Sequence, residues 1–219
     1  MQIKHNMEKI FFDEDTFIWK TKLYFVNKKD SIMSNVNDII NINSEIKTDN
    51  YKYKKSSKSF TFDGALDVKN ELDEIINKSI ELCKELYGKE YNQINYACWI
   101  NVIRSINPVQ IQFKHKSLKD VNKYHIHTDI QKQTNMFYPN FTWVYYVQMP
   151  DVMEGEDGVL YIKGMDEKEY WIRPEEDDLI IMMGDLPHAP NNSPKAKINR
   201  IVLAGNVGFE YIKNKKSII

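Results

Sequence analysis

Three side chains with the chemistry of metal ligands stand out in the second half of the chain. His127 and Asp129 are separated by Thr128, a β-branched residue that suits a strand. Residues two apart on a strand point to the same side, so this imidazole and this carboxylate can hold one ion from one direction. His188, much later in the chain, offers a third ligand. Two histidines and one carboxylate suit ferrous iron and leave coordination positions open for a substrate and oxygen.

The other histidines need to be weighed against this set. A His with an Asp two residues later often occurs by chance, so the pair gains weight only from the candidate residues that come later in the chain. His125 lies on the same strand face as His127, but a pair of histidines alone lacks the carboxylate, so we expect His125 beside the ligands or on the substrate side. His5 and His115 have no partners in the sequence and are expected to be structural or exposed. A lone His in a Pro-flanked turn, such as His188, would also be structural.

Arg200 opens a strand-like stretch that alternates between two faces. One face carries Ile201, Leu203 and Val207, and the other carries Arg200, Val202, Ala204 and Asn206. This alternation predicts a guanidinium that faces the interior of a barrel. A buried guanidinium needs a partner, and a carboxylate held by two parallel N–H bonds is the natural one. A dicarboxylate cosubstrate would supply it. The alternatives are a protein acid as partner, or an Arg at an exposed edge.

Composition limits the kinds of protein that these residues can belong to. The 219 residues fit one large domain or two small ones, and a hydrophobic content of 42% is enough for a core. The 30 basic residues nearly balance the 31 acidic ones, which argues against nucleic-acid and membrane-surface partners. Cys83 and Cys98 form no CxxC pair. Neither a signal-peptide core nor an apolar run long enough for a bilayer is present, so we expect an intracellular, cytoplasmic protein.

The first half of the chain predicts mixed structure. We expect strands within residues 10–26, a short helix at 31–42, and a solvated Lys-rich loop at 43–62, although its tyrosines and lysines also suit contact with phosphate. Residues 67–87 have apolar side chains at helical spacing, with Gly88 as the stop, and predict the best helix of the chain. Cys83 lies on its apolar stripe and is expected to be a buried small hydrophobe.

The second half predicts a sandwich or barrel. Short runs of branched and aromatic residues, separated by Gly, Pro and Asp turns, predict a series of strands. Their expected ranges are 96–104, 109–114, 142–149, 159–163, 169–173, 179–183 and 200–207. The acidic turn at 151–157 is expected to be solvated. We expect both halves to pack as one domain.

Taken in this order, His127-x-Asp129, His188 and Arg200 resemble the 2-oxoglutarate/Fe(II)-dependent dioxygenase superfamily over residues 95–210. The stretches 141–148, 157–162 and 173–188 resemble the prolyl-hydroxylase-like branch, although Glu176-Asp177-Asp178 stands where Gly-Asp is usual. The chain is similar to short phage-type or bacterial members with unassigned substrates. The resemblance does not extend to residues 1–90.

The resemblance implies a fold and a set of site residues. The fold is mainly β with supporting helices, as a single domain over residues 1–219. Residues 94–212 form a double-stranded β-helix (jelly-roll, cupin-like) catalytic core, and residues 1–93 form a mixed helix and strand supporting region. The implied iron ligands are His127, Asp129 and His188, and Arg200 holds the far carboxylate of 2-oxoglutarate. Tyr146 donates to that carboxylate or belongs to the core, Thr142 on the same strand face assists, Asn101 and Asn206 are weaker candidates, and Tyr145 is core.

The implied reaction uses Fe(II), 2-oxoglutarate and O2 to hydroxylate a C–H bond, with release of succinate and CO2. A free amino acid, a peptide and another small metabolite all remain possible substrates. Residues 130–140 either close over the substrate as a lid or pack as a surface loop. One alternative is a cupin-like metal-binding protein, an isomerase or sensor that does not use 2-oxoglutarate and needs no inward-facing Arg200. Another is a β-sandwich binding module with structural histidines and no tight iron binding.

Overall fold

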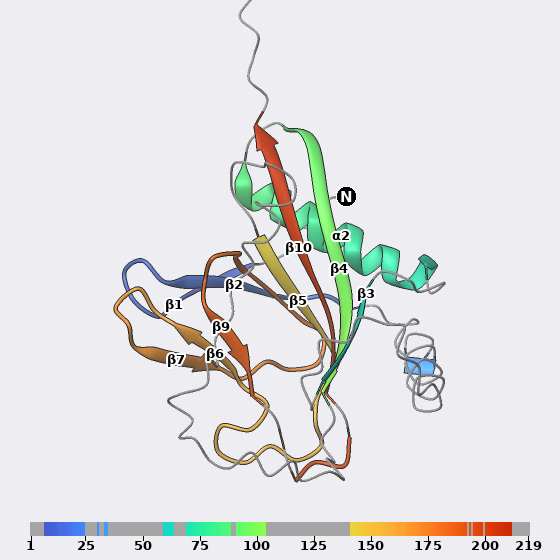
Figure 1. Cartoon of the computed structure of the whole chain (residues 1–219), viewed down its shortest axis with the longest axis vertical. Helices are drawn as coiled ribbons and strands as arrows, with labels where there is room; N and C mark the ends of the chain where they lie inside the picture. Colours follow the sequence, from blue (N-terminus) through green and yellow to red (C-terminus); the bar gives the residue numbers. More distant parts are fainter. Residues whose placement is uncertain are drawn as a thin grey trace, which may run out of the picture.

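Two antiparallel sheets and one long helix make up the part of the protein that the computed structural model describes (Figure 1). The described residues are 7–24, 30, 33–34, 59–63, 69–88, 91–103, 141–191, 193, 195–198 and 200–211. The larger sheet has seven strands in the order β1-β2-β8-β5-β10-β4-β3, and the smaller sheet has three in the order β7-β6-β9.

The elements follow one another along the chain, with short connections from β5 onward. The larger sheet consists of β1 (Glu8–Phe11), β2 (Phe17–Lys22), β3 (Ser59–Asp63), β4 (Tyr91–Ile103), β5 (Phe141–Gln148), β8 (Asp178–Met183) and β10 (Arg200–Tyr211). The smaller sheet consists of β6 (Leu160–Lys163), β7 (Glu169–Ile172) and β9 (His188–Pro190), and the helix is α2 (Lys69–Tyr87). Strands from both halves of the chain therefore share the larger sheet.

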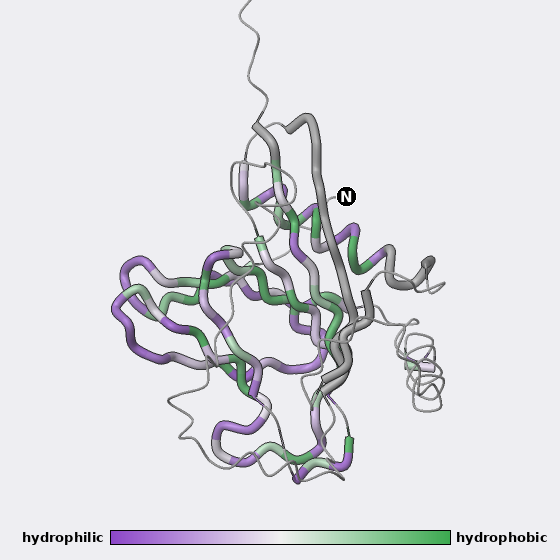
Figure 2. Tube along the Cα trace, viewed as in Figure 1, coloured by the Kyte–Doolittle hydropathy of each residue, from purple (hydrophilic) through white to green (hydrophobic). Residues whose placement is uncertain are grey.

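The larger sheet is buried on both faces because its central strands alternate between two cores. On β5, Trp143 and Tyr145 pack toward α2, whereas Val144 and Tyr146 pack toward the smaller sheet. Leu160 and Ile162 of β6 complete the second core from the opposite side. We call this second core the inter-sheet core. The hydropathy colouring shows the same arrangement, with apolar segments where the strands pack together (Figure 2).

Helix α2 confirms the expectation for residues 67–87. Ile75, Ile76 and Cys83 are buried against the larger sheet. Gly88 ends the helix at a φ of 67°, a left-handed conformation that glycine adopts without steric cost. Burial raises the pKa of the Cys83 thiol, as expected of an inert core residue.

Two expectations for the first half are wrong. Residues 59–62 belong to β3 rather than to a solvated loop, because the alternating segment Ser59–Asp63 pairs with β4. Leu23 and Tyr24 lie beyond β2 instead of in a strand, and the Leu23 N–H donates to the Asp177 carbonyl at 2.9 Å. The strand expected at 109–114 and most of the helix expected at 31–42 lie outside the described residues.

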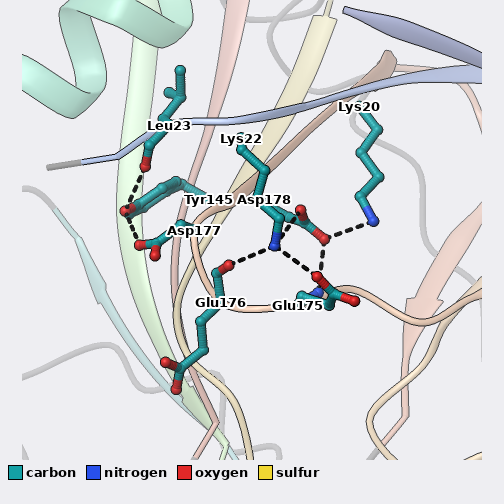
Figure 3. Close-up of polar contacts among 8 residues, drawn as sticks. All are labelled: Lys20, Lys22, Leu23, Tyr145, Glu175, Glu176, Asp177 and Asp178. Carbon is teal, nitrogen blue, oxygen red and sulfur yellow. Dashed lines mark hydrogen bonds and ion pairs between the residues drawn. The ribbon is translucent and has the colours of Figure 1, made fainter.

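A cluster of charged side chains attaches β2 to the start of β8 (Figure 3). The buried Asp178 carboxylate lies 2.8 Å from Nζ of Lys20 and 3.2 Å from Nζ of Lys22, and it also accepts from the Glu175 amide at 2.7 Å. Removing one partner of a buried charge pair is strongly destabilising, so this cluster holds the two strands in register.

Asp177, next to this cluster, has an unusual backbone conformation. Its φ is 67°, the left-handed conformation that favours glycine and that Asp tolerates better than most residues. Its carboxylate accepts from the Tyr145 hydroxyl at 2.9 Å, and its N–H donates to the Tyr146 carbonyl at 2.9 Å. Asp177 therefore adopts a backbone conformation typical of glycine at this turn and also fixes the backbone of β5.

Replacing Gly205 by alanine is expected to destabilise the fold. Gly205 lies directly opposite Trp143 in the β5–β10 pair, and a Cβ on it would lie 2.5 Å from Cε2 and 2.8 Å from Nε1 of that ring. The ring is fully buried, and because protein interiors are close-packed it can move aside only by displacing its neighbours. Overpacking of this kind costs about 1–3 kcal/mol, which chemical denaturation measures directly.

A double-mutant cycle tests the stated cause. Trp143→Phe supplies a smaller ring, and the indole Nε1 has no hydrogen-bond partner in the described structure that would be lost. Gly205→Ala should therefore cost less in the Trp143→Phe background than in the native chain. Equal costs in both backgrounds would show that the indole is not what excludes the methyl group.

Candidate functional site

Arg200 is a buried cation between the two sheets. It opens β10, is only 2% exposed, and shares its strand face with Val202 and Ala204 of the inter-sheet core. Its Nη1 donates to the Asn191 carbonyl at 3.0 Å, and its Nε has no hydrogen-bond partner in the described part of the chain. Burial lowers the pKa of Arg200, because the charge has lost its water, although a guanidinium stays protonated in proteins.

Tyr146 lies beside this guanidinium. Its ring centroid is 5.8 Å from Cζ of Arg200, and its side chain is fully buried on β5. Burial raises the pKa of Tyr146 to about 12, and the nearby positive charge opposes this only in part. The phenol is therefore protonated and able to donate, yet its hydroxyl has no partner among the described residues.

A β-bulge adjoins both residues. Val202 pairs with Tyr146 whereas Ile201 pairs with Gln148, so β5 has one extra residue at this point. Bulges re-aim the neighbouring side chains and are frequent beside functional sites. Here the extra residue is Val147, which directly follows Tyr146 on β5, and the register shifts between Ile201 and Val202, next to Arg200 on β10.

Arg200 and Tyr146 together form an incomplete polar site. In the part of the chain that the structure describes, no acid pairs with Arg200. A buried charge without a counter-charge costs several kcal/mol, and a buried hydroxyl without a partner adds to this cost. A bound carboxylate would accept from both groups and remove both penalties. The donor set therefore fits an organic acid.

His188 faces the same inter-sheet core from the smaller sheet. It begins β9, is 3% exposed, and pairs with Ile162, which belongs to that core. Its Nδ1 lies 2.8 Å from the carbonyl oxygen of Leu186. A carbonyl can only accept, so Nδ1 carries a proton, and in the Nδ1–H tautomer of imidazole the lone pair is on Nε2. This is the tautomer of a histidine that ligates a metal through Nε2.

Thr142 and Asn206 form a separate polar pair on the face of the larger sheet that carries Tyr146 and Arg200. They lie opposite each other on β5 and β10, and the Thr142 hydroxyl donates to Oδ1 of Asn206 at 2.8 Å. Thr142 is four residues from Tyr146, which is about 13 Å along a strand. The structure therefore brings Arg200 together with Tyr146, and Thr142 together with Asn206.

Other expected residues lie elsewhere or outside the described structure. Tyr145 packs toward α2 as expected, and the backbone of Asn101 pairs with Val202 on β10. The segment with His125, His127 and Asp129 and the expected lid at 130–140 lie outside the described residues. Within the described ranges, no group of three His, Cys, Asp or Glu side chains is placed to hold a metal ion. Nor does any helix of those ranges have the length and apolar character needed to cross a membrane.

Sequence reasoning missed Asn191, the residue that contacts Arg200. Its contact is made by the backbone carbonyl, so the residue type carries no signal of it. Asn191 comes directly after β9 in a Pro- and Asn-rich connection, which predicts only a loop.

Comparison with known proteins identifies the fold. No protein-family model and no curated protein matches the chain. An oxidoreductase of the 2OG-Fe(II) oxygenase family from Burkholderia pseudomallei aligns with a TM-score of 0.53 and 10% identity, over 87% of this chain and 84% of that one. A viral collagen prolyl hydroxylase from Paramecium bursaria Chlorella virus-1, solved as a 2OG complex, aligns with a TM-score of 0.50 and 10% identity, over 90% and 98%.

A third solved structure adds a peptide complex. The prolyl hydroxylase from Trichoplax adhaerens, in complex with a hypoxia inducible factor oxygen degradation domain peptide fragment, aligns with a TM-score of 0.51 and 13% identity, over 88% of this chain and 83% of that one. At these identities the likeness shows a shared fold. The expected mainly β fold with a double-stranded β-helix core is thereby confirmed, and it is the fold of 2OG-Fe(II) oxygenases.

Proposed function

We propose that this protein is a 2-oxoglutarate- and Fe(II)-dependent dioxygenase that hydroxylates a C–H bond of an amino acid, a peptide or another small metabolite. The observation that carries the proposal is the buried guanidinium of Arg200 beside the buried Tyr146 hydroxyl, with no acid paired to it in the described structure. An oxygenase fold and an unmet requirement for a carboxylate point to the same cosubstrate. A cupin-like metal protein that does not use a keto acid needs no such cation.

One group of residues would bind the cosubstrate, and a second group would bind iron. Arg200 would form the ion pair with the far carboxylate of 2-oxoglutarate, and Tyr146 would donate to the same carboxylate. His188 would bind iron through Nε2, with His127 and Asp129 as the proposed remaining ligands. When bound, ferrous iron and 2-oxoglutarate supply the oxygen chemistry, and the overall reaction converts R–H, O2 and 2-oxoglutarate into R–OH, succinate and CO2.

Apolar residues of the inter-sheet core adjoin the described part of this site. Leu186, Val202 and Ala204 of the inter-sheet core lie next to the proposed iron and cosubstrate residues. A dry, apolar environment strengthens the ion pair of Arg200 and holds reactive groups away from solvent. Among the substrate classes, a peptide is supported by the peptide complex of a structurally similar prolyl hydroxylase.

Anaerobic reconstitution tests the proposed function. With Fe(II) and 2-oxoglutarate together, we expect saturable binding of 2-oxoglutarate by calorimetry and a visible absorption band that neither addition gives alone. Admission of O2 should then release succinate, even slowly, in the absence of substrate. The matched controls replace 2-oxoglutarate by succinate or by a monocarboxylic keto acid. Succinate should give no visible band, and the monocarboxylic keto acid should bind much more weakly than 2-oxoglutarate. Absence of both binding and the band from correctly folded protein would refute the proposal.

A further inference from the structure

The orientation of Arg200 depends on one hydrogen bond. Among the described residues, the Asn191 carbonyl is the acceptor of the Arg200 guanidinium, with Nη1 at 3.0 Å. An arginine stem has many rotamers, and a planar guanidinium binds a carboxylate well only when its N–H fork is turned correctly. A fixed acceptor on Nη1 decides which way the fork faces. The position of the Asn191 carbonyl therefore bears directly on the Arg200 site.

Asn191 is itself held by its backbone and its side chain. Its N–H donates to the Val159 carbonyl at 2.9 Å, which extends the pairing of β9 with β6 by one residue. Its Nδ2 donates to the Glu156 carbonyl at 2.7 Å and lies 3.4 Å from the Tyr161 hydroxyl. These contacts leave the Asn191 carbonyl little freedom to move.

The acidic turn supplies the other side of this attachment. It is exposed, as expected for a solvated turn, but it also binds the connection that leads to β10. The Asp151 carboxylate accepts from the amides of Lys197 and Ile198 at 2.8 and 3.1 Å, and Glu154 forms an ion pair with Lys195. The Tyr161 hydroxyl donates to the Glu156 carboxylate. The acidic turn is therefore bonded both to Asn191 and to residues 195–198, on the connection that leads to Arg200.

We propose that Asn191 is a positioning residue that turns Arg200 toward the cosubstrate carboxylate, because the hydrogen bond from its side-chain amide to the Glu156 carbonyl fixes its own carbonyl. The inference rests on the proposed function and adds a residue that orients the 2-oxoglutarate-binding arginine. Asn191 touches neither iron nor cosubstrate in this assignment, because it acts through Arg200. Its side chain should therefore influence the affinity for 2-oxoglutarate and not the affinity for iron.

Asn191→Ala removes the amide that donates to Glu156. We expect the dissociation constant and KM for 2-oxoglutarate to rise about 10-fold, equivalent to about one hydrogen bond, with little change in kcat at saturating 2-oxoglutarate or in Fe(II) affinity. Asn191→Asp keeps the size of the side chain but loses the N–H donor, so it should give a loss of the same order. Asn77→Ala, an exposed position on α2, is the matched control and should leave all these quantities unchanged.

A double mutant separates positioning from a general effect on the fold. If Asn191 acts through the geometry of the arginine fork, Asn191→Ala should have a much smaller effect in an Arg200→Lys background, since an ammonium has no fork to turn. Full additivity of the two substitutions would overturn the proposal. So would folded Asn191→Ala and Asn191→Asp proteins that bind 2-oxoglutarate as the native chain does. A native chain that fails to bind 2-oxoglutarate at all would instead overturn the proposed function, and the role of Asn191 with it.

Discussion

Arg200→Met is expected to raise the dissociation constant for 2-oxoglutarate by about 30-fold or more, because losing one partner of a buried, hydrogen-bonded charge pair costs about 2–5 kcal/mol. The same substitution should leave the ligand-free protein as stable as the native chain, or more stable. The guanidinium is buried with its Nε unpartnered and no acid paired to it in the described residues, so an apolar side chain of similar length removes a desolvated charge.

These opposite effects distinguish a binding residue from a structural one. Calorimetry with Fe(II) and 2-oxoglutarate measures the affinity, and thermal unfolding without ligand measures the stability. Arg200→Lys is the matched control, since it keeps the charge but loses the planar fork, and it should fall between the native chain and Arg200→Met in affinity. A ligand-free Arg200→Met protein that is strongly destabilised, with unchanged 2-oxoglutarate affinity, would mean that Arg200 serves the fold alone.

The faces of the strands were predictable from the sequence because the side-chain period of a strand is two. Ile201, Leu203 and Val207 pack toward α2, and Val202 and Ala204 pack toward the smaller sheet, as the alternation predicted. Both faces of β10 are covered, so a slip by one residue would move every side chain into the wrong core. The helix at Lys69–Tyr87 was predictable for a similar local reason, since its apolar stripe and its glycine stop lie within one short segment.

Features that depend on distant partners were not predictable. The strand Ser59–Asp63 comes after a Lys-rich segment, and only its pairing with β4 makes it a strand. Asp177 adopts a conformation expected of glycine because Tyr145 and the neighbouring charge cluster hold it there. Asn191 contacts Arg200 through a main-chain oxygen, which every residue type possesses. In each case the missing information is which residues meet across the fold.

His188→Ala is expected to abolish 2-oxoglutarate-dependent turnover and to lower Fe(II) affinity by at least about 100-fold. Even the loss of a residue that only hydrogen-bonds to a metal ligand costs about 10–100-fold in metal affinity or activity. The physical reason is the tautomer: with Nδ1 bonded to the Leu186 carbonyl, Nε2 carries the lone pair that would bind iron. His188→Asn is the more informative variant, because its amide can still donate to Leu186 while it lacks that lone pair. It should keep the fold and still lose the metal.

A set of parallel variants decides whether His188 belongs to the proposed triad. His127→Ala and Asp129→Ala should match His188→Ala in Fe(II) binding measured anaerobically, because three ligands on one ion fail together. His125→Ala should bind Fe(II) like the native chain, because it lies outside the proposed ligand set although it shares a predicted strand face with His127 and Asp129. Loss of iron in His125→Ala with retention in His127→Ala would transfer the ligand role to His125. Retention of iron and of the visible band in His188→Asn would remove His188 from the site, and with it the assignment of β9 to the metal centre.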